Sequence, residues 1–186
     1  MNIQEQIKMY HSSNEQEKKD QEFILKMMNE KDIFERKNTV AHFTASAWVT
    51  NPSHTKVLMI YHRIYDSWSW MGGHADGCED LFEVAKKELK EESGLNSFSS
   101  NGNIFSLEVL PVKKHIKKDR TVESHVHLNV TYLFEIDENE PLKVNLEETK
   151  GIQWISLNEL KNKVKETWML ENIYSKLILK MHGGTK

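Results

Sequence analysis

The spacing of apolar residues divides the chain into two parts. Over residues 1–38 apolar side chains recur every three or four positions, which predicts two short helices. Ser13 and Gln16 have the spacing of a capping box, so the second helix is expected to begin there. The apolar positions of these two helices are Ile3, Ile7, Tyr10, Phe23, Ile24, Met27 and Met28. We predict a helical extension at residues 1–38, which could be a structural cap, a substrate lid or a dimer arm.

From Val40 the pattern changes to short apolar runs rich in β-branched and aromatic residues, which predicts strands. Two helices are expected after the last strand: Ser156 and Glu159 have capping-box spacing at the start of the first, and the second carries a long apolar face over residues 170–181. Strands interleaved with helices predict a mixed α/β sandwich over residues 39–186. The predicted strands cover residues 40–50, 56–63, 102–114, 123–136 and 151–156.

Composition narrows the class of protein. The chain has 186 residues, of which 38% are hydrophobic and 28% charged, enough for one ordinary core. Its net charge of −3 disfavours a strongly basic binder of DNA or RNA duplexes. A single cysteine, Cys78, excludes an internal disulfide and a zinc site made of cysteines alone. We find no apolar run of about 20 residues and no signal-peptide core, so a cytoplasmic protein without a membrane partner is expected.

One segment combines a glycine pair with a well-delimited helix. Gly72 and Gly73 open a loop, and Asp80 has the spacing of a helix N-cap. Gly94 stands where a C-terminal glycine cap belongs. The signals predict a helix of about 13 residues after Asp80, with Leu81, Ala85 and Leu89 as its buried stripe.

Three carboxylates lie on one side of this helix. Glu88 and Glu92 are four residues apart, and Glu91 is three from Glu88. Like charges at this spacing repel one another. A divalent cation such as Mg²⁺ or Mn²⁺ would remove the repulsion, because hard cations take oxygen ligands. The alternative is a solvated acidic helix face.

The whole segment resembles the Nudix box, G-x5-E-x7-R-E-U-x-E-E-x-G-U, in which U is a bulky aliphatic residue. Lys87 replaces the arginine of the signature, and every other fixed position agrees. A tryptophan-rich strand before the glycine pair and the pattern from Trp154 to Leu160 also look like the family. The positions aligned with the fixed positions of the signature are Gly73, Glu79, Lys87, Glu88, Leu89, Glu91, Glu92, Gly94 and Leu95.

The resemblance implies a Nudix-type α/β/α sandwich with a mixed sheet and a metal-dependent hydrolase. Its substrate would be a nucleoside diphosphate linked to another moiety, cleaved by attack of water at phosphorus. Mg²⁺ or Mn²⁺ would be held by Glu88, Glu91, Glu92 and the carbonyl of Gly72 or Gly73. The resemblance implies catalytic roles for Glu88, for Glu91 and for Glu148 in the loop before Trp154, with Glu147 as the second choice in that loop.

The resemblance also implies a structural brace, in which the residue at position 87 pairs with Glu79. Lys87 can make this pair only as a point charge, without the bidentate fork of an arginine. We therefore expect a functional but weaker brace.

Five residues outside the box are candidates for substrate binding: His125, His127, Trp70, Tyr65 and Lys114. His125 and His127 alternate on one face of a strand and could contact phosphate or base, or simply be strand histidines. Lys114 belongs to a basic loop over residues 113–120 that could steer an anion or be merely solvated. Trp70 and Tyr65 could stack on a base or fill the core. His74, beside Gly73, could approach the metal.

Two other functions stay open. A Nudix-like sensor or regulator without turnover would usually lack box glutamates, and all are present here. An isoprenoid diphosphate isomerase would need a catalytic cysteine on the strand side of the pocket, whereas Cys78 lies in the box loop. The expected partner is a small nucleotide, and a homodimer is compatible with the sequence.

Overall fold

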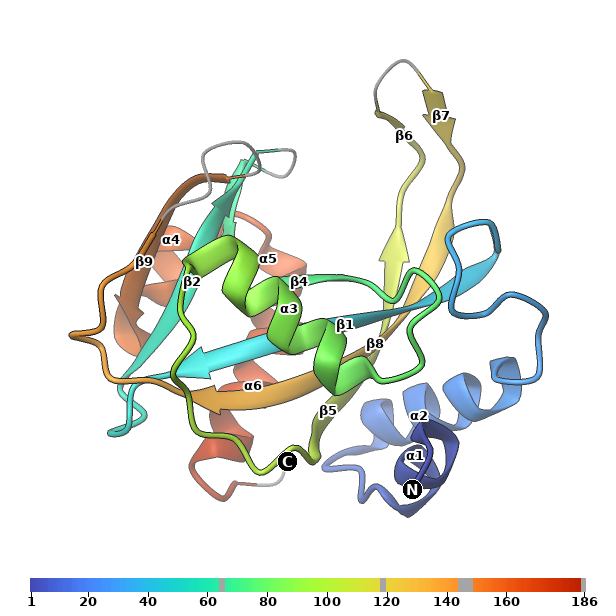
Figure 1. The fold of residues 1–186 in the computed structure, drawn as a ribbon, viewed down its shortest axis with the longest axis horizontal. Coiled ribbons are helices and arrows are strands. Elements are labelled where there is room, and N and C mark those ends of the chain that lie inside the picture. Colours follow the sequence, from blue (N-terminus) through green and yellow to red (C-terminus); the bar gives the residue numbers. More distant parts are fainter. Residues whose placement is uncertain (64–65, 118–119, 144–148, 185–186) are drawn as a thin grey trace.

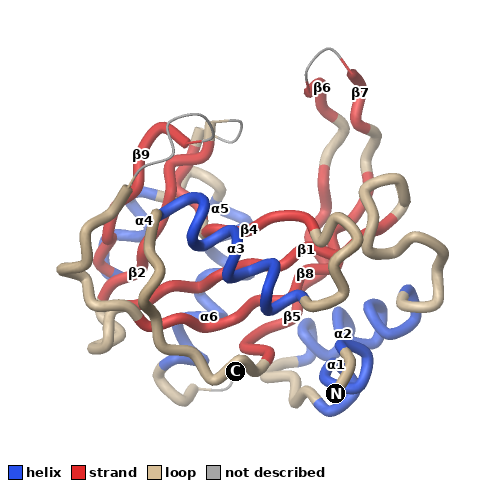
Figure 2. The backbone as a smooth tube through the Cα atoms, in the orientation of Figure 1, coloured by secondary structure: helices blue, strands red, loops and turns tan. Residues whose placement is uncertain are grey.

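The computed structural model describes residues 1–63, 66–117, 120–143 and 149–184. Its centre is a seven-stranded mixed sheet with helices on both faces (Figures 1 and 2). The path β3-β2-β1-β8-β5 runs through the sheet, with β4 paired to β1 and β9 paired to β2. A separate hairpin of β6 and β7 projects from the body of the molecule (Figure 1). The strands are β1 Ala41–Thr50, β2 Lys56–His62, β3 Ser67–Ser69, β4 Met71–His74, β5 Ile104–Val112, β6 His115–Lys117, β7 Arg120–Val122, β8 His125–Glu135 and β9 Thr149–Ser156.

Strand β1 is the middle of the sheet, and all ten of its residues are buried. It pairs in parallel with β8 and antiparallel with β2 and β4. Because the sheet is covered on both faces, β1 shows no exposed side, as expected for a strand inside an α/β fold. The predicted mixed α/β sandwich with N-terminal helices is confirmed.

The helices complete the two outer layers. In the box segment, Asp80 accepts the backbone N–H of Glu83 at 3.1 Å, and Gly94 ends the helix with a φ of 73°. Both predicted caps of this helix are therefore confirmed. The helices are α1 Ile3–Met9, α2 Glu15–Met27, α3 Leu81–Ser93, the 3₁₀ turn η1 Leu157–Glu159, α4 Leu160–Lys163, α5 Thr167–Met169, the π-helical turn η2 Leu170–Tyr174 and α6 Ser175–Met181.

Two hydrophobic cores lie on opposite faces of the sheet. The first core joins α3 and the N-terminal helices to residues such as Phe43 and Leu128. The second core packs Trp48 and Trp70 against Tyr174 and Leu177 of the C-terminal helices. The apolar face predicted for residues 170–181 thus packs on the second core as expected, with Ile173, Tyr174 and Leu177 buried, although part of it winds as a π-helix.

Two predicted caps are wrong. Helix α2 is capped by Asn14, whose side chain accepts the N–H of Glu17 at 2.8 Å, rather than by Ser13 with Gln16. Ser13 instead donates its N–H to the Glu17 carboxylate at 2.6 Å. Ser156 makes no side-chain capping hydrogen bond, because the chain there enters a 3₁₀ turn instead of an α-helix.

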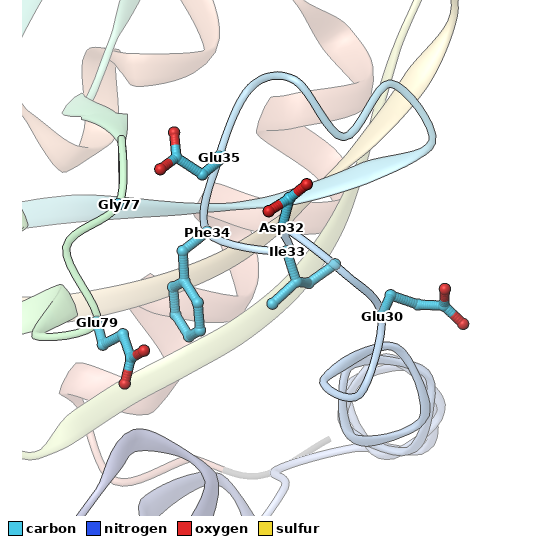
Figure 3. Close-up of a pocket in the computed structure, with 7 residues that line it drawn as sticks. All are labelled: Glu30, Asp32, Ile33, Phe34, Glu35, Gly77 and Glu79. Atoms are coloured by element: carbon cyan, nitrogen blue, oxygen red, sulfur yellow. The ribbon is translucent and has the colours of Figure 1, made fainter.

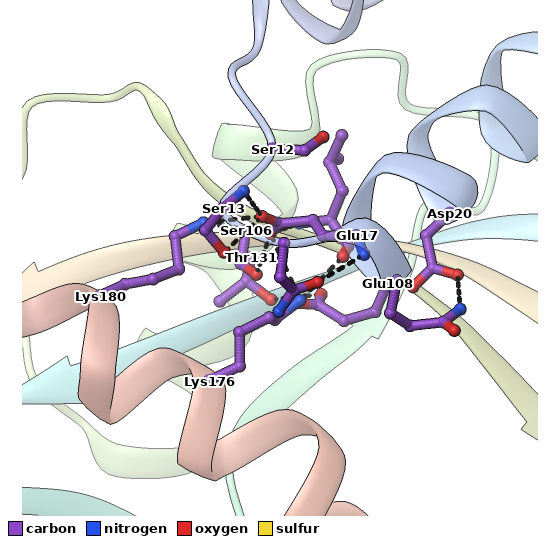
Figure 4. Close-up of polar contacts among 12 residues, drawn as sticks. Ser12, Ser13, Glu17, Asp20, Ser106, Glu108, Thr131, Lys176 and Lys180 are labelled. Atoms are coloured by element: carbon purple, nitrogen blue, oxygen red, sulfur yellow. Dashed lines mark hydrogen bonds and ion pairs between the residues drawn. The ribbon is translucent and has the colours of Figure 1, made fainter. Parts of the chain in front are cut away.

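A buried ion network fastens the N-terminal helices to the domain (Figure 4). Glu17 of α2 and Glu108 of β5 are both fully buried. Lys176 of α6 lies 3.3 Å from Glu17 and 2.9 Å from Glu108, and Lys180 lies 3.1 Å from Glu17. Ser106 also belongs to the network, because its Oγ donates a hydrogen bond of 2.8 Å to Glu17. Charges from three distant segments therefore neutralise one another inside the protein.

Among the residues that the structure describes, we find no helix long and apolar enough to cross a membrane.

Candidate active site

Helix α3 places two of its carboxylates against β4, which contains Gly72 and Gly73 and is called the glycine strand below. Glu92 is buried, and its Oε2 accepts the backbone N–H of Gly72 at 3.3 Å. The carboxylate of Glu88 lies directly against the Cα of Gly73, where any added Cβ would collide with it. Helix and strand can approach this closely because neither glycine has a side chain.

Gly72 is constrained from the other side of the strand. A Cβ at this position would lie 2.7 Å from the carbonyl oxygen of Ala45 and from Ser46 Oγ on β1. The glycine pair therefore sits between β1 and α3 with no room for larger residues. This packing fixes the backbone beside the two carboxylates.

Glu91 occupies a different environment from its two neighbours. Its side chain is about half exposed, and the Nζ of Lys87 lies 3.8 Å from its Oε2. Among the described residues, Lys87 forms an ion pair with Glu91 and none with Glu79. The expected ion pair is thus not seen between these two described residues, and an effect of Lys87 on activity stays a prediction.

Glu79 faces the N-terminal extension instead. It lines a shallow hollow of about 340 Å³ between the box loop and the segment that follows α2 (Figure 3). Gly77 comes close to Glu35 in the same place, since an added Cβ would lie 3.0 Å from Glu35 Oε1. The hollow is lined by Glu30, Asp32, Ile33, Phe34, Glu35, Gly77 and Glu79.

An arginine from the extension lies close to the box. The guanidinium of Arg36 binds both carboxylate oxygens of Asp76, with Nε 2.6 Å from Oδ1. This hydrogen bonding raises the pKa of Arg36 and lowers that of Asp76. The negative charge of Glu88 also contributes to the raised pKa of Arg36. Arg36 is therefore a cation at the edge of the carboxylate site, supplied from outside the box.

Four histidines gather at one end of the sheet. His125 Nε2 and His127 Nε2 are 3.2 Å apart, which confirms that the two side chains share a face. The ring of His42 lies 4.8 Å from that of His125 and 5.0 Å from that of His127. The ring of His74 lies 4.9 Å from that of His127.

Burial and the neighbouring positive groups lower the pKa of two of these histidines, His42 and His127. Burial, followed by the charges of His74 and His42, lowers the pKa of His127 to about 2. Burial is also the main cause of the lowered pKa of His42. His42 carries no signal in the sequence alone, because its partners come from a strand more than 80 residues away.

The remaining residues singled out in the sequence lie in different environments. Trp70 is 9% exposed and packs edge-on against Tyr174, so the structure makes it a core residue rather than a stacking surface. Lys114 is exposed and forms an ion pair with Glu123 at 2.8 Å. Cys78 is exposed. Tyr65, Glu147 and Glu148 lie outside the described residues.

Comparisons with known proteins agree with this arrangement. A family model for the NUDIX domain matches residues 40–177. The structure of an Ap4A hydrolase from C. elegans, a binary complex, is similar at 16% identity and a TM-score of 0.53, over 76% of this chain and 95% of that chain. The dihydroneopterin triphosphate pyrophosphohydrolase of E. coli is similar at 14% identity and a TM-score of 0.55, over 73% of this chain and 94% of that one. No match is found among the curated proteins.

Proposed function

The chain belongs to the Nudix family, and on that premise we propose that it is a pyrophosphohydrolase with a specific reaction. The substrate is a nucleoside diphosphate linked to another moiety, and water cleaves its diphosphate linkage. The reaction depends on Mg²⁺ or Mn²⁺ held at the carboxylates of α3.

A single observation carries the proposal: the carboxylates of Glu88 and Glu92 converge on the backbone of Gly72 and Gly73. Carboxylate and carbonyl oxygens are the donors that Mg²⁺ and Mn²⁺ take, so the residues present fit the cation. When bound, such a cation neutralises charge on the phosphoryl oxygens and acidifies a bound water.

The glutamate side chains have different roles in the proposed reaction. Glu88 and Glu92 hold the cation, and their contacts with the glycine strand fix their positions. Glu91 is exposed beside them and accepts the proton of the attacking water on its carboxylate, with Glu148 as the alternative base. The oxygen of that water forms a bond to phosphorus as the P–O bond to the leaving phosphate breaks.

The experiment is a panel of nucleoside diphosphate derivatives assayed for released phosphate products. Hydrolysis should vanish in EDTA and return with Mg²⁺ or Mn²⁺. Turnover by protein freed of metal, or no turnover of any diphosphate in the panel, would contradict the proposal.

A further inference from the structure

We propose that His42, His125 and His127 form a binding site for a divalent transition-metal cation of the Zn²⁺ type, with His74 beside it as a fourth ligand. This site is distinct from the carboxylate site on α3. It uses different residues and a different chemical class of donor.

The strand register brings the histidines together. His42 on β1 and His127 on β8 are direct partners in the parallel pair, and His125 lies two residues earlier on the same face. His74 on β4 pairs with Thr44, two residues after His42, and so shares that face as well. Three adjacent strands therefore present imidazoles at one place.

The hydrogen bonds of two rings leave nitrogen lone pairs for a metal. His42 Nδ1 lies 2.9 Å from the carbonyl oxygen of Asn38, and His125 Nδ1 lies 2.8 Å from that of Glu123. A carbonyl only accepts hydrogen bonds, so both Nδ1 atoms carry a proton, and in the neutral rings each Nε2 carries a lone pair. The contact of 3.2 Å between His125 Nε2 and His127 Nε2 holds one proton, which a bound cation would displace. A histidine that binds a metal is commonly oriented by this same contact to a backbone carbonyl.

His42 supplies the strongest single observation. The residue is only 4% exposed, and among the described residues its Nε2 has no hydrogen-bond partner. Burying a polar atom without a partner costs free energy. A cation coordinated by Nε2 would satisfy this atom.

The distances are close to those of a coordination shell. One ligand nitrogen from each of His42, His125 and His127 lies within 4.8 Å of the other two, and the two Nε2 atoms of His125 and His127 are 3.2 Å apart. Tetrahedral Zn²⁺ with Zn–N bonds of about 2.0–2.1 Å separates its nitrogens by about 3.4 Å. Small rotations of the side chains would therefore close the shell.

The neutral form of two of the rings suits metal ligands. The rings of His42 and His127 are neutral, which is the form that binds metals, and a neutral ring brings no charge to attract phosphate. Arg36 is the nearby cation, and its charge is compensated by the bidentate contact with Asp76. Imidazole donors select Zn²⁺ and its neighbours rather than Mg²⁺.

The test is a calorimetric titration of the full chain with Zn²⁺, after EDTA treatment and dialysis, in an excess of Mg²⁺ that occupies the carboxylate site. We expect one tightly bound Zn²⁺ per chain and a higher melting temperature in its presence. Absence of Zn²⁺ binding would overturn the proposal.

Matched variants locate the bound ion. His127→Gln should weaken Zn²⁺ binding at least about 100-fold, and His125→Gln, at the start of its strand where folding is least at risk, should do the same. His11→Gln, at an exposed position, is the control and should bind like the wild type. Unchanged Zn²⁺ binding in the two cluster variants would refute the site.

A further variant separates this proposal from the hydrolase reaction. Glu88→Gln combined with Glu92→Gln should abolish Mg²⁺-dependent turnover but keep tight Zn²⁺ binding and its rise in melting temperature. Loss of Zn²⁺ binding in that protein would place the ion at the box carboxylates and overturn the histidine site, whatever the outcome for hydrolysis.

Discussion

Three polar clusters lie at the sheet: the ion network around Lys176, the carboxylates of α3 and the histidine cluster. They differ in the kinds of charged and polar groups that each brings together. In the network, each buried charge contacts an opposite one: Lys176 reaches both Glu17 and Glu108. In the carboxylate group, Glu88 and Glu92 lie side by side on one helix face, and in the histidine group His42 Nε2 lacks a donor among the described residues. The ion network contains its own opposite charges, whereas carboxylate oxygens and imidazole nitrogens are donors of the kinds that cations take.

The pKa values within the network reflect this internal balance. Burial alone would raise the pKa of Glu17, but the ammonium groups of Lys176 and Lys180 outweigh burial and lower it. Burial alone would lower the pKa of Lys176, but Glu108 and Glu17 raise it. Both partners are therefore held in their charged forms.

The largest effect that we predict concerns the carboxylate group. Glu92→Gln should reduce kcat by about 10²–10⁴-fold and weaken Mg²⁺ binding, because it removes a charged ligand. The free energy of unfolding should stay the same or rise, since repulsion with Glu88 is relieved. Kinetics and urea denaturation measure the two quantities.

The control for this variant is Glu83→Gln on the same helix. Glu83 is exposed and pairs with Lys86 rather than with the glycine strand, so turnover should change little. Equal damage by both variants in folded protein would show that the site of Glu92 is not special.

Substitutions in the ion network should lower stability and leave turnover unchanged. Lys176→Met leaves Glu17 and Glu108 short of their shared buried partner, which should cost about 3–5 kcal/mol of unfolding free energy. The kcat of the folded fraction should be unchanged. Lys165→Met removes an exposed partner of Asp66 and should leave the urea midpoint almost where it was. A stable Lys176→Met protein with impaired turnover would reverse the roles that we assign.

A third variant tests the packing that holds Glu88. Gly73→Ala pushes a methyl group into the Glu88 carboxylate and should reduce kcat by about 10²-fold, because small displacements of a catalytic group are costly. Gly151→Ala is the matched control, since its added Cβ meets nothing closer than Trp68 at 3.9 Å. If the two variants turn over alike, the close approach of Glu88 to Gly73 has no catalytic value.

The smallest predicted effect is a pH dependence of stability. The folded pKa of Glu17 lies below its unfolded value of about 4.3, so its contribution is complete above about pH 5 and is lost as the pH falls through the folded pKa. Glu17→Gln should therefore flatten the decline in unfolding free energy between about pH 5 and pH 3, by up to about 1.4 kcal/mol per pH unit. Urea titrations over this range provide the measurement, and parallel curves for the two proteins would contradict it.

Local signals in the sequence were sufficient where the interacting atoms are neighbours along the chain. The caps of α3 at Asp80 and Gly94 act within one helical turn, and both are formed. The cap of α2 was misplaced by one residue because Ser13 and Asn14 both offer a side-chain oxygen there. In the structure Asn14 accepts the N–H of Glu17, while Ser13 donates its N–H and its Oγ–H to the Glu17 carboxylate.

The sequence by itself determined the mixed α/β architecture, the extent of α3 and the common side of Glu88 and Glu92, because periodicity and caps depend on residues a few positions apart. Only the tertiary structure decided that His42 meets His127, that Glu17 pairs with Lys176, and that Glu91 stays exposed while Glu92 is buried. These contacts follow from which strands and helices become neighbours. That choice is made by burying both faces of the whole sheet at once, and no short stretch of sequence encodes it.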